Sequence, residues 1–216
     1  STLMTEIWLI RHGQTDWNIQ GRFQGRCDVP LNPTGIRQTE RAAQALARIH
    51  IDAVWSSPLS RATQTARIIA EPHRLSVDVL EDLTEICHGT WEGLKSDAVA
   101  SRWPELLDRW HRKPEGVKMP GPGGESLGDV KERSVRALAQ ITDQTSEAAI
   151  VVAHDAVLKT MLCHLLDMPL SSFWRFRLEN GSISVFDFSG GDPVLCVCGD
   201  GCHLGNGYVG SVQLGL

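Results

Sequence analysis

The stretch Glu6-Ile7-Trp8-Leu9-Ile10-Arg11-His12-Gly13 decides how this chain folds. Glu6 to Ile10 has the composition of a short β-strand, because aromatic and β-branched residues prefer extended backbone. The strand is predicted to end at Arg11-His12-Gly13, where glycine lets the chain turn. Two basic side chains are therefore expected at the carboxyl end of a strand.

A helix is predicted to begin shortly after this turn. Asn32 is a good N-cap, and Pro33 suits the first helical position because that position needs no backbone N–H. The apolar residues that follow have helical spacing, which predicts one buried stripe made of Ile36, Ala43, Leu46 and Ile49.

Strands and helices then continue to alternate. Strands are predicted over residues 53–56, 76–80, 148–153 and 182–188, and helices from the cap at Ser57-Pro58 to about residue 70 and over 156–166. The run from Ala148 to Ala153 is apolar throughout, as a strand inside a parallel sheet is. The pattern predicts an α/β fold: a three-layer sandwich with a mostly parallel central sheet and helices on both faces.

We expect a single domain over residues 1–216 with two additions to the alternating core. Residues 96–124 are rich in Trp and then in Pro and Gly, and we interpret them as a lid or insertion over the sheet. Ser126 and Asp129 have the spacing of a capping box for the helix that leads back to the core. A C-terminal extension covers about residues 190–216.

Composition excludes several classes of protein. The chain has 216 residues, 42% of them hydrophobic and 22% charged, which is typical of folded globular domains. With a net charge of -5 and no basic run, it is not expected to bind nucleic acid. No apolar run approaches the about 20 residues of a membrane span, and the N-terminus does not resemble a signal peptide.

Six scattered cysteines favour reduced thiols in a cytoplasmic protein. Three of them, Cys196, Cys198 and Cys202, precede His203, and together these four residues could in principle bind zinc. The alternation from Val194 to Cys198 favours an edge strand with buried free cysteines instead. A further alternative brings His203 back to the rim of the pocket.

Four basic side chains are predicted to meet at one edge of the sheet. Arg11 and His12 follow the first strand, Arg61 lies in the helix after the second, and His154 follows the buried strand. Ligands of open α/β sheets bind at this carboxyl edge. Guanidinium groups bind phosphate oxygens and a neutral imidazole can attack phosphorus, so the chemistry indicated is phosphoryl transfer through a histidine.

Four motifs in order resemble the histidine phosphatase superfamily, the phosphoglycerate mutase-like enzymes. Leu9-Ile10-Arg11-His12-Gly13-Gln14-Thr15, with Asn18 and Phe23-Gln24-Gly25, resembles the opening signature of that family. The segment from Ser56 to Ala66 resembles its second arginine segment, Leu83-Thr84-Glu85 its acidic residue, and Val151-Val152-Ala153-His154 its second histidine. The resemblance covers residues 6 to about 188.

This resemblance implies a phosphoglycerate mutase-like fold and a role for each matched residue. His12 would become transiently phosphorylated, while Arg11, Arg61 and His154 hold the phosphoryl oxygens. Asn18, Gln24 and Gly25 would complete the substrate-binding loop, and Glu85 would give a proton to the leaving group and then activate water. Neither a metal nor another cofactor is expected.

One position departs from the family pattern, which often has Gly after the second histidine. This chain has Asp155 there. Its carboxylate either orients His154 or caps the following helix, and the sequence does not choose between the two.

Hydrolysis is favoured over the mutase reaction. Only 69 positions separate Glu85 from His154, so the lid is shorter than in the cofactor-dependent mutases of the family and water should enter more easily. A phosphoglycerate mutase and a nonenzymatic binding module are the alternatives. The occupied catalytic positions argue against the binding module.

The expected partner is a small phosphate ester, and phosphoserine is the first candidate. Residues 85–93 and Phe173-Trp174-Arg175-Phe176 resemble the metal-independent phosphoserine phosphatases of the family. In those enzymes the histidine at the position of His88 contacts the substrate carboxylate. Alternatively, His88 packs under the lid with Trp91. Sugar phosphates, phosphoglycerate and ribazole phosphate are rival substrates, and formation of a homodimer is left open.

Overall fold

Two parallel strands, β1 (Glu6–Arg11) and β4 (Ala148–Ala153), form the centre of the fold in a computed structural model that describes residues 4–205. They pair in register from Glu6 with Ala148 to Arg11 with Ala153. Every residue of β4 is buried. The prediction of a central, fully buried strand is confirmed.

The sheet has six strands in the order β3-β2-β4-β1-β5-β6. The other strands are β2 (Ala53–Ser56), β3 (Val77–Val79), β5 (Ile183–Asp187) and β6 (Val194–Asp200). β3, β2, β4 and β1 pair in parallel, whereas β5 is antiparallel to both β1 and β6. The sheet is therefore mostly parallel, as predicted.

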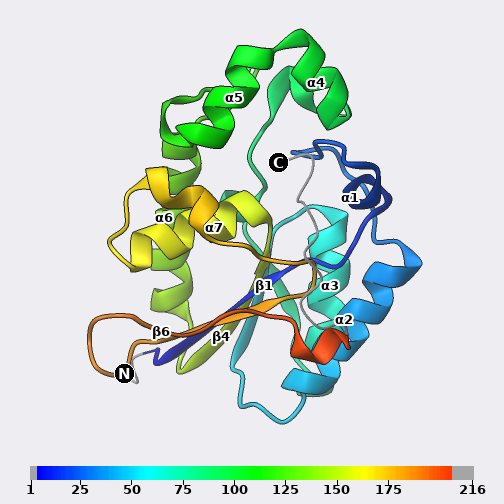
Figure 1. The fold of residues 1–216 in the computed structure, drawn as a ribbon. Helices are drawn as coiled ribbons and strands as arrows, with labels where there is room; N and C mark the ends of the chain where they lie inside the picture. The colour runs from blue at the N-terminus through cyan, green and yellow to red at the C-terminus, as the bar shows by residue number, and fades with distance from the viewer. Residues whose placement is uncertain (1–3, 206–216) are drawn as a thin grey trace.

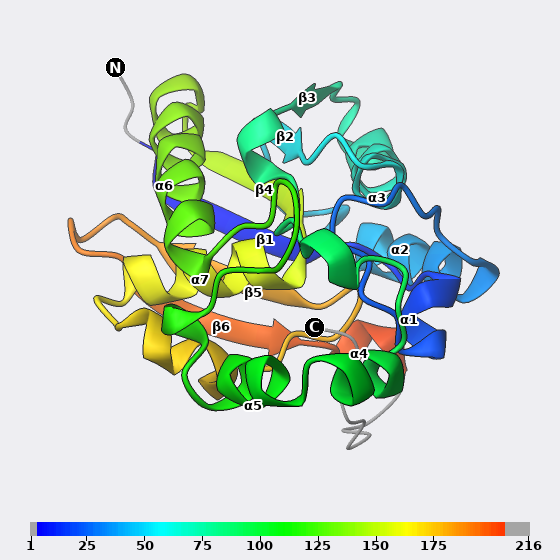
Figure 2. The same ribbon diagram turned by 90° about the horizontal axis from the view of Figure 1, so that it is seen from above.

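Helices cover both faces of the sheet (Figures 1 and 2). One face packs against α2 (Pro33–Leu46) and α3 (Ser60–Ala70), and the other against α6 (Leu127–Gln144) and α7 (Asp155–Leu165). Successive residues of β4 alternate between the two cores, with Ile150 on the α2–α3 side and Val151 on the α6–α7 side. Because both sides of β4 face a core, the strand is apolar throughout. The prediction of a three-layer fold is confirmed.

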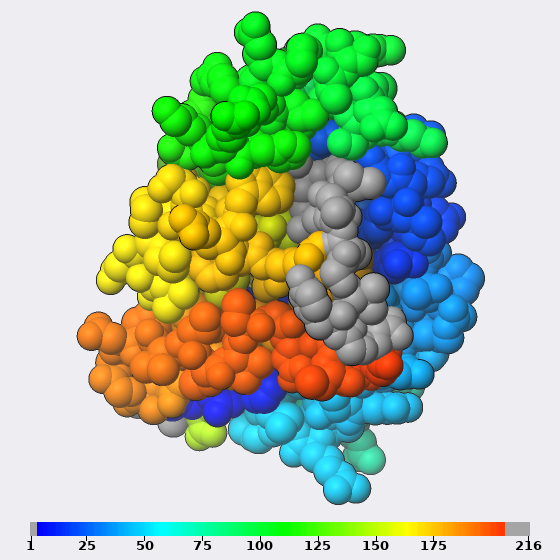
Figure 3. All heavy atoms as spheres, in the orientation of Figure 1, coloured from blue at the N-terminus to red at the C-terminus, as the bar shows by residue number. Residues whose placement is uncertain are grey.

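The segment predicted to be a lid contains α4 (Ser96–Arg102) and α5 (Pro104–Arg112), which form the top layer of the molecule in Figures 1 and 3. Trp110 of α5 is fully buried, and its ring centroid lies 5.4 Å from that of Phe173. That this segment acts as a lid stays a prediction. The remaining short elements are α1 (Asp16–Gln20), η1 (Glu71–His73), η2 (Glu81–Leu83), η3 (Gly89–Trp91), η4 (Pro114–Gly116), η5 (Leu170–Arg175) and η6 (Cys202–Leu204).

Two of the three predicted helix caps are present. The side chain of Asn32 accepts a hydrogen bond from the Gly35 N–H at 2.8 Å, and Ser126 and Asp129 form a reciprocal capping box. The predicted apolar stripe of α2 is wrong in part. Ile36 is 38% exposed, because the buried face of α2 starts at Gly35. Ile49 lies beyond the end of the helix but packs, partly buried, against the same core as Ala43 and Leu46.

Gly35 faces the sheet because the loop after β1 touches it backbone to backbone. A Cβ on Gly35 would lie 2.1 Å from the carbonyl oxygen of Gln14, and a Cβ on Gly13 would lie 2.4 Å from that of Gly35. Neither position has room for a side chain. This contact fixes the loop of the first motif against the first turn of α2.

The predicted helix start at Ser57-Pro58 is wrong. α3 begins at Ser60, and Leu59 occupies the N-cap position without a side-chain cap. The Ser57 hydroxyl accepts a hydrogen bond from the Leu59 N–H at 3.3 Å and lies 2.7 Å from a ring nitrogen of His154. Ser57 therefore belongs to the edge of the sheet rather than to the helix.

The C-terminal part departs from prediction at its cysteines. β6 is the predicted edge strand, but Cys196 and Cys198 are exposed rather than buried. Cys196, Cys198, Cys202 and His203 do not form a metal-binding group. Within residues 4–205 the one group of this kind is His50, Asp52 and Glu147, at the amino ends of β2 and β4. Residues 206–216 of the predicted extension lie outside the described residues.

No helix in residues 4–205 is long and apolar enough to cross a bilayer. All six cysteines are free, in agreement with the expectation of reduced thiols.

Because β4 contributes to both cores, truncating one of its side chains should be costly. We expect Ile150→Ala to lower the free energy of unfolding by about 2–5 kcal/mol, since it removes a fully buried side chain. Urea denaturation would measure the change. Ile19→Ala is the matched control: Ile19 is 66% exposed, and its loss should change stability by less than about 0.5 kcal/mol. Equal effects would contradict the central role of β4.

Candidate active site

Three polar side chains stand in a row at the carboxyl edge of the sheet, each directly after a strand. His12 follows β1, Ser57 follows β2 and His154 follows β4. The His154 Nε2 lies 2.7 Å from the Ser57 hydroxyl, and the ring centroids of His154 and His12 are 5.0 Å apart. Because the strand order is β2-β4-β1, the row follows the sheet.

Hydrogen bonding fixes the tautomer of His12. Its Nδ1 lies 2.7 Å from the carbonyl oxygen of Gly13. A carbonyl oxygen can only accept, so Nδ1 carries the proton and Nε2 presents a lone pair. Burial, with the nearby charges of Arg61 and Arg11, holds the pKa of His12 well below the ordinary value of 6.5. The ring is thus neutral, with a lone pair on Nε2.

Two buried arginines lie close enough to act on His12 with their charge, and backbone carbonyls hold both. Arg61 donates from Nη1 to Cys27 and from Nη2 to Gly25, each at 2.7 Å, and Arg11 donates from Nη1 to Leu178 at 2.5 Å. Burial lowers the pKa of Arg61 to about 10, so it stays charged at neutral pH. The geometry of the two cations is set before any ligand binds.

The carbonyl of Gly25 depends on a backbone conformation that favours glycine. Gly25 has φ of 51°, and a Cβ there would lie 2.1 Å from the Glu92 carboxylate. Gly25 thus acts through the position of its carbonyl, which Arg61 contacts.

Three buried nitrogen atoms of the site have no hydrogen-bond partner within the described chain: Arg11 Nε, Arg61 Nε and His154 Nδ1. Buried donors in native proteins are nearly always satisfied. Since the first two can only donate, the group that satisfies them must supply acceptors. Together with the positive charge of two guanidinium groups, this requirement defines an anion site.

The predicted amides Asn18 and Gln24 are oriented by Thr15. The Asn18 Oδ1 accepts from the Thr15 N–H at 2.9 Å and from Asn180 Nδ2 at 3.3 Å, while the Gln24 Oε1 accepts from the Thr15 hydroxyl at 2.8 Å. With both oxygens engaged, the NH₂ groups are the ends left for a ligand. Sequence reasoning missed Thr15 and Asn180, although the Thr15–Asn18 spacing is that of a capping box.

Glu85 reaches the same edge from the loop after η2. Its Oε2 accepts a hydrogen bond from the Ala156 N–H at 3.2 Å, in the first turn of α7. Burial raises the pKa of this carboxyl, and the nearby charge of Asp155 adds to the rise. A raised pKa keeps more of the group protonated, as a proton donor requires.

His88 packs beside Trp91, as one of its two alternatives predicted, and its contact with a substrate carboxylate stays a prediction. It is 1% exposed, and its ring centroid lies 5.0 Å from that of Phe23 and 6.5 Å from that of Trp91. Burial, with the charge of Arg61, lowers the pKa of His88 to about 3, so the ring is neutral. Its Nδ1 has no hydrogen-bond partner within residues 4–205. The ring packs beside Trp91 and still offers one nitrogen to a ligand.

Asp155 has neither of the two roles considered from the sequence. Its carboxylate lies 2.8 Å from Lys159 Nζ and 3.6 Å from Arg11 Nη1, and His154 is the N-cap residue of α7. The ammonium group of Lys159 also lies 4.8 Å from the centroid of the Trp174 ring. Asp155 thus pairs with the positive charges of both Lys159 and Arg11.

His203, from η6, lies 2.8 Å from the carbonyl oxygen of Gly181.

An α/β sheet that presents a neutral histidine between two fixed arginines defines a phosphate-handling enzyme. The chain belongs to the histidine phosphatase superfamily (branch 1), whose family model matches residues 7–200. It is a phosphoric monoester hydrolase.

Relatives and solved structures agree with this assignment. The chain is 37% identical to phosphoserine phosphatase 1 of Hydrogenobacter thermophilus, over 95% of this chain and 97% of that protein. It is 30% identical to adenosylcobalamin/alpha-ribazole phosphatase of Escherichia coli, over 85% and 90% of the two chains. A mutant phosphoserine phosphatase from Entamoeba histolytica, solved with phosphoserine, superposes with a TM-score of 0.80 at 32% identity, over 93% of this chain and all of that one.

The hydrogen bond from His12 to Gly13 makes the protonation state of the nucleophile testable. At pH 6.5, where an ordinary histidine is half protonated, we expect His12 in the free enzyme to be neutral and protonated at Nδ1 only. Imidazole ¹⁵N chemical shifts would measure this, with the signal assigned by its loss in His12→Asn. A doubly protonated ring at that pH would contradict the assigned tautomer and the lowered pKa.

Proposed function

We propose that this enzyme hydrolyses the phosphate ester of a small carboxylate-bearing metabolite, with phosphoserine as the first candidate, through a phosphohistidine at His12. The observation that carries the proposal is the set of three unpartnered buried nitrogens around a neutral His12. The oxygens of a phosphoryl group would satisfy them. The same group would then face the lone pair of His12 Nε2.

In the first step, His12 Nε2 attacks phosphorus and the bond from phosphorus to the ester oxygen breaks. Charge on the phosphoryl oxygens is stabilised by Arg11 and Arg61, whose carbonyl anchors avoid reorganisation during the reaction. The leaving alkoxide takes the proton of Glu85. Products of this step are the free alcohol and phosphohistidine.

In the second step, water attacks the phosphohistidine. The Glu85 carboxylate takes a proton from that water, the bond between nitrogen and phosphorus breaks, and inorganic phosphate leaves. His12 is neutral again and Glu85 is protonated again. Each transfer is assigned to a side chain, so no cofactor enters the proposal.

Phosphoserine is favoured by His88 and by the two relatives named above that are phosphoserine phosphatases. A neutral imidazole that donates to a carboxylate makes a charge-assisted hydrogen bond, because the acceptor is ionised. The unpartnered His88 Nδ1 is suited to this contact. An alpha-ribazole phosphate, the substrate named for the Escherichia coli relative, is the second candidate. It lacks a carboxylate and would not use His88 in this way.

The nucleophile is tested by trapping the intermediate. We expect His12→Ala to abolish turnover, and rapid quench of the native enzyme with labelled phosphoserine to trap acid-labile, base-stable phosphate on His12. His50→Ala is the control, since His50 lies at the opposite edge of the sheet; its turnover should be unchanged. Label on serine or aspartate, or none under rapid quench, would refute the nucleophile assignment.

The substrate is tested at His88. His88→Phe keeps a ring against Phe23 and Trp91 but removes both ring nitrogens. It should lower kcat/KM for phosphoserine by roughly 10- to 150-fold, the loss of one hydrogen bond to a charged group. Turnover of para-nitrophenyl phosphate, which has no carboxylate, should change much less. Equal losses on both substrates would leave His88 with a packing role. A native enzyme that prefers ribazole phosphate would refute phosphoserine as the substrate.

A cytoplasmic location is also part of the proposal. Six free cysteines suit a reducing compartment. Cell fractionation tests the location, and sedimentation tests the oligomeric state.

A further inference from the structure

The loop that carries Glu85 is held by a pair of side chains that the mechanism does not use. We call residues 82–88 the acid loop, and residues 119–126 the bracing loop. Glu125 of the bracing loop and Arg133 of α6 form a two-pronged ion pair, with Nε to Oε2 at 2.9 Å and Nη2 to Oε1 at 3.0 Å. Their side chains are only 14% and 8% exposed.

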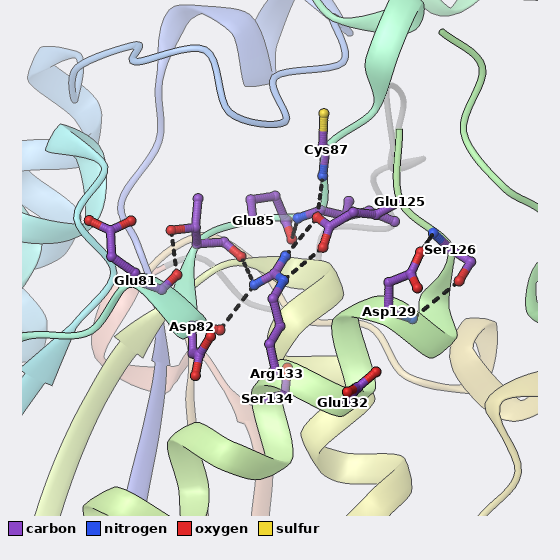
Figure 4. A network of polar contacts seen from close by, with 12 residues as sticks. Glu81, Asp82, Glu85, Cys87, Glu125, Ser126, Asp129, Glu132, Arg133 and Ser134 are labelled. Atoms are coloured by element: carbon purple, nitrogen blue, oxygen red, sulfur yellow. Dashed lines mark hydrogen bonds and ion pairs between the residues drawn. The ribbon is translucent and has the colours of Figure 1, made fainter. Parts of the chain in front are cut away.

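This ion pair contacts the acid loop on both sides of Glu85. Arg133 Nη1 donates to the carbonyl oxygens of Thr84 and, at 3.0 Å, Asp82. The Glu125 Oε1 accepts from the Cys87 N–H at 2.9 Å, and the Glu125 N–H donates to the Cys87 carbonyl at 3.0 Å. Figure 4 shows Arg133 between Glu125 and the backbone of the acid loop.

The pair thus fixes the residue before Glu85 and the second residue after it. On the other side, the Glu85 carboxylate meets the Ala156 N–H. Backbone and carboxylate are therefore held from opposite directions. A proton donor must lie within hydrogen-bond reach of the leaving oxygen, so this arrangement determines where the proton can be delivered.

The network also reaches the phosphate-binding loop. Arg26, next to Gly25, donates from Nη2 to the Glu125 Oε1 at 3.2 Å. Burial alone would raise the pKa of Glu125, but the hydrogen bonds and charge of Arg133 lower it. An ionised Glu125 accepts from three segments that are distant in sequence.

We propose that Glu125 and Arg133 are positioning residues for the general acid, which set the protonation of the leaving group and not the binding of the phosphoryl group. The inference rests on the proposed role of Glu85. A merely structural role would reduce the turnover of every substrate alike. A positioning role predicts a loss of kcat/KM that is larger for a substrate whose leaving group must be protonated than for one whose leaving group departs as a stable anion.

Two substrates separate these possibilities. The alkoxide of serine is strongly basic and must be protonated as it leaves, whereas para-nitrophenolate is a stable anion that leaves without a proton. We expect Glu125→Gln to lower kcat/KM for phosphoserine by roughly 10- to 100-fold, as for a catalytic group displaced by about 1 Å. For para-nitrophenyl phosphate, kcat/KM should fall by less than about threefold, because kcat/KM covers only the steps up to the departure of the leaving group and not the hydrolysis of the phosphohistidine, which both substrates share. Arg133→Lys, which keeps the charge but loses the fork, should show the same selectivity.

Arg136→Gln is the matched control. Arg136 lies three residues further along α6 and pairs with the Asp82 side chain, but its own side chain is 58% exposed and does not contact Glu125 in the described structure. Both activities of this variant should equal those of the native enzyme. The thermal midpoint of each variant, followed by circular dichroism, reports any loss of folded protein.

A double-mutant cycle with Glu85→Gln completes the test. Without the acid there is nothing left to position, so Glu125→Gln should cause no further loss with phosphoserine in that background. A full additional loss there, or equal losses on the two substrates in the native background, would overturn the positioning role. If Glu85→Gln lowers kcat/KM equally for both substrates, the proposed acid is wrong and this inference falls with it. If Glu85→Gln lowers kcat/KM selectively for phosphoserine but Glu125→Gln lowers it equally for both substrates, the positioning role is overturned and the proposed function is not.

Discussion

The register of β4 between β1 and β2 is the constraint on which the rest of this enzyme depends. Arg11 pairs with Ala153, and Ser56 pairs with Val152, so three neighbouring parallel strands end at almost the same level. The residues that follow them are His12, His154 and Ser57. A slip of one residue in β4 would exchange its two buried faces and would also separate the two histidines. Core packing and the geometry of the site are thus enforced by the same pairing.

Around this edge, polar groups are held mainly by backbone atoms. Carbonyls anchor Arg11 and Arg61, a carbonyl sets the tautomer of His12, and a backbone N–H meets the carboxylate of Glu85. Backbone partners move only if the fold moves, so the charges and dipoles are in place before the reaction. Burial has a second effect: it keeps His12 neutral and raises the pKa of Glu85. His12 and Glu85 therefore acquire the forms that their proposed roles require from the same buried environment.

The sequence predicted the fold and the residues at the sheet edge because both depend on local patterns. Strand composition, one apolar run and the positions of basic residues after strands are readable without coordinates. What could not be predicted are pairings between side chains far apart in the chain, such as Ser57 with His154 or Glu125 with Arg133 and the acid loop. The prediction that Ile36 is buried was wrong for a related reason: its exposure follows from the contact of Gly35 with the loop after β1. Asp155 was noticed, but its partner Lys159 was not, although the two residues have the i,i+4 spacing of a helical ion pair; the sequence does not show that both side chains are buried.

The close approach of Gly13 and Gly35 has a consequence for how such a scaffold can diversify. The nucleophile loop and the start of α2 meet backbone to backbone, so neither can accept a side chain or change length without moving the other. The acid loop, in contrast, is attached largely through the exchangeable side chains Glu125 and Arg133. The part of the site that carries His12 is therefore rigidly specified, while the part that carries Glu85 can be rebuilt by substitution. Relatives that share the fold but are named for phosphoserine and for ribazole phosphate accord with such a division.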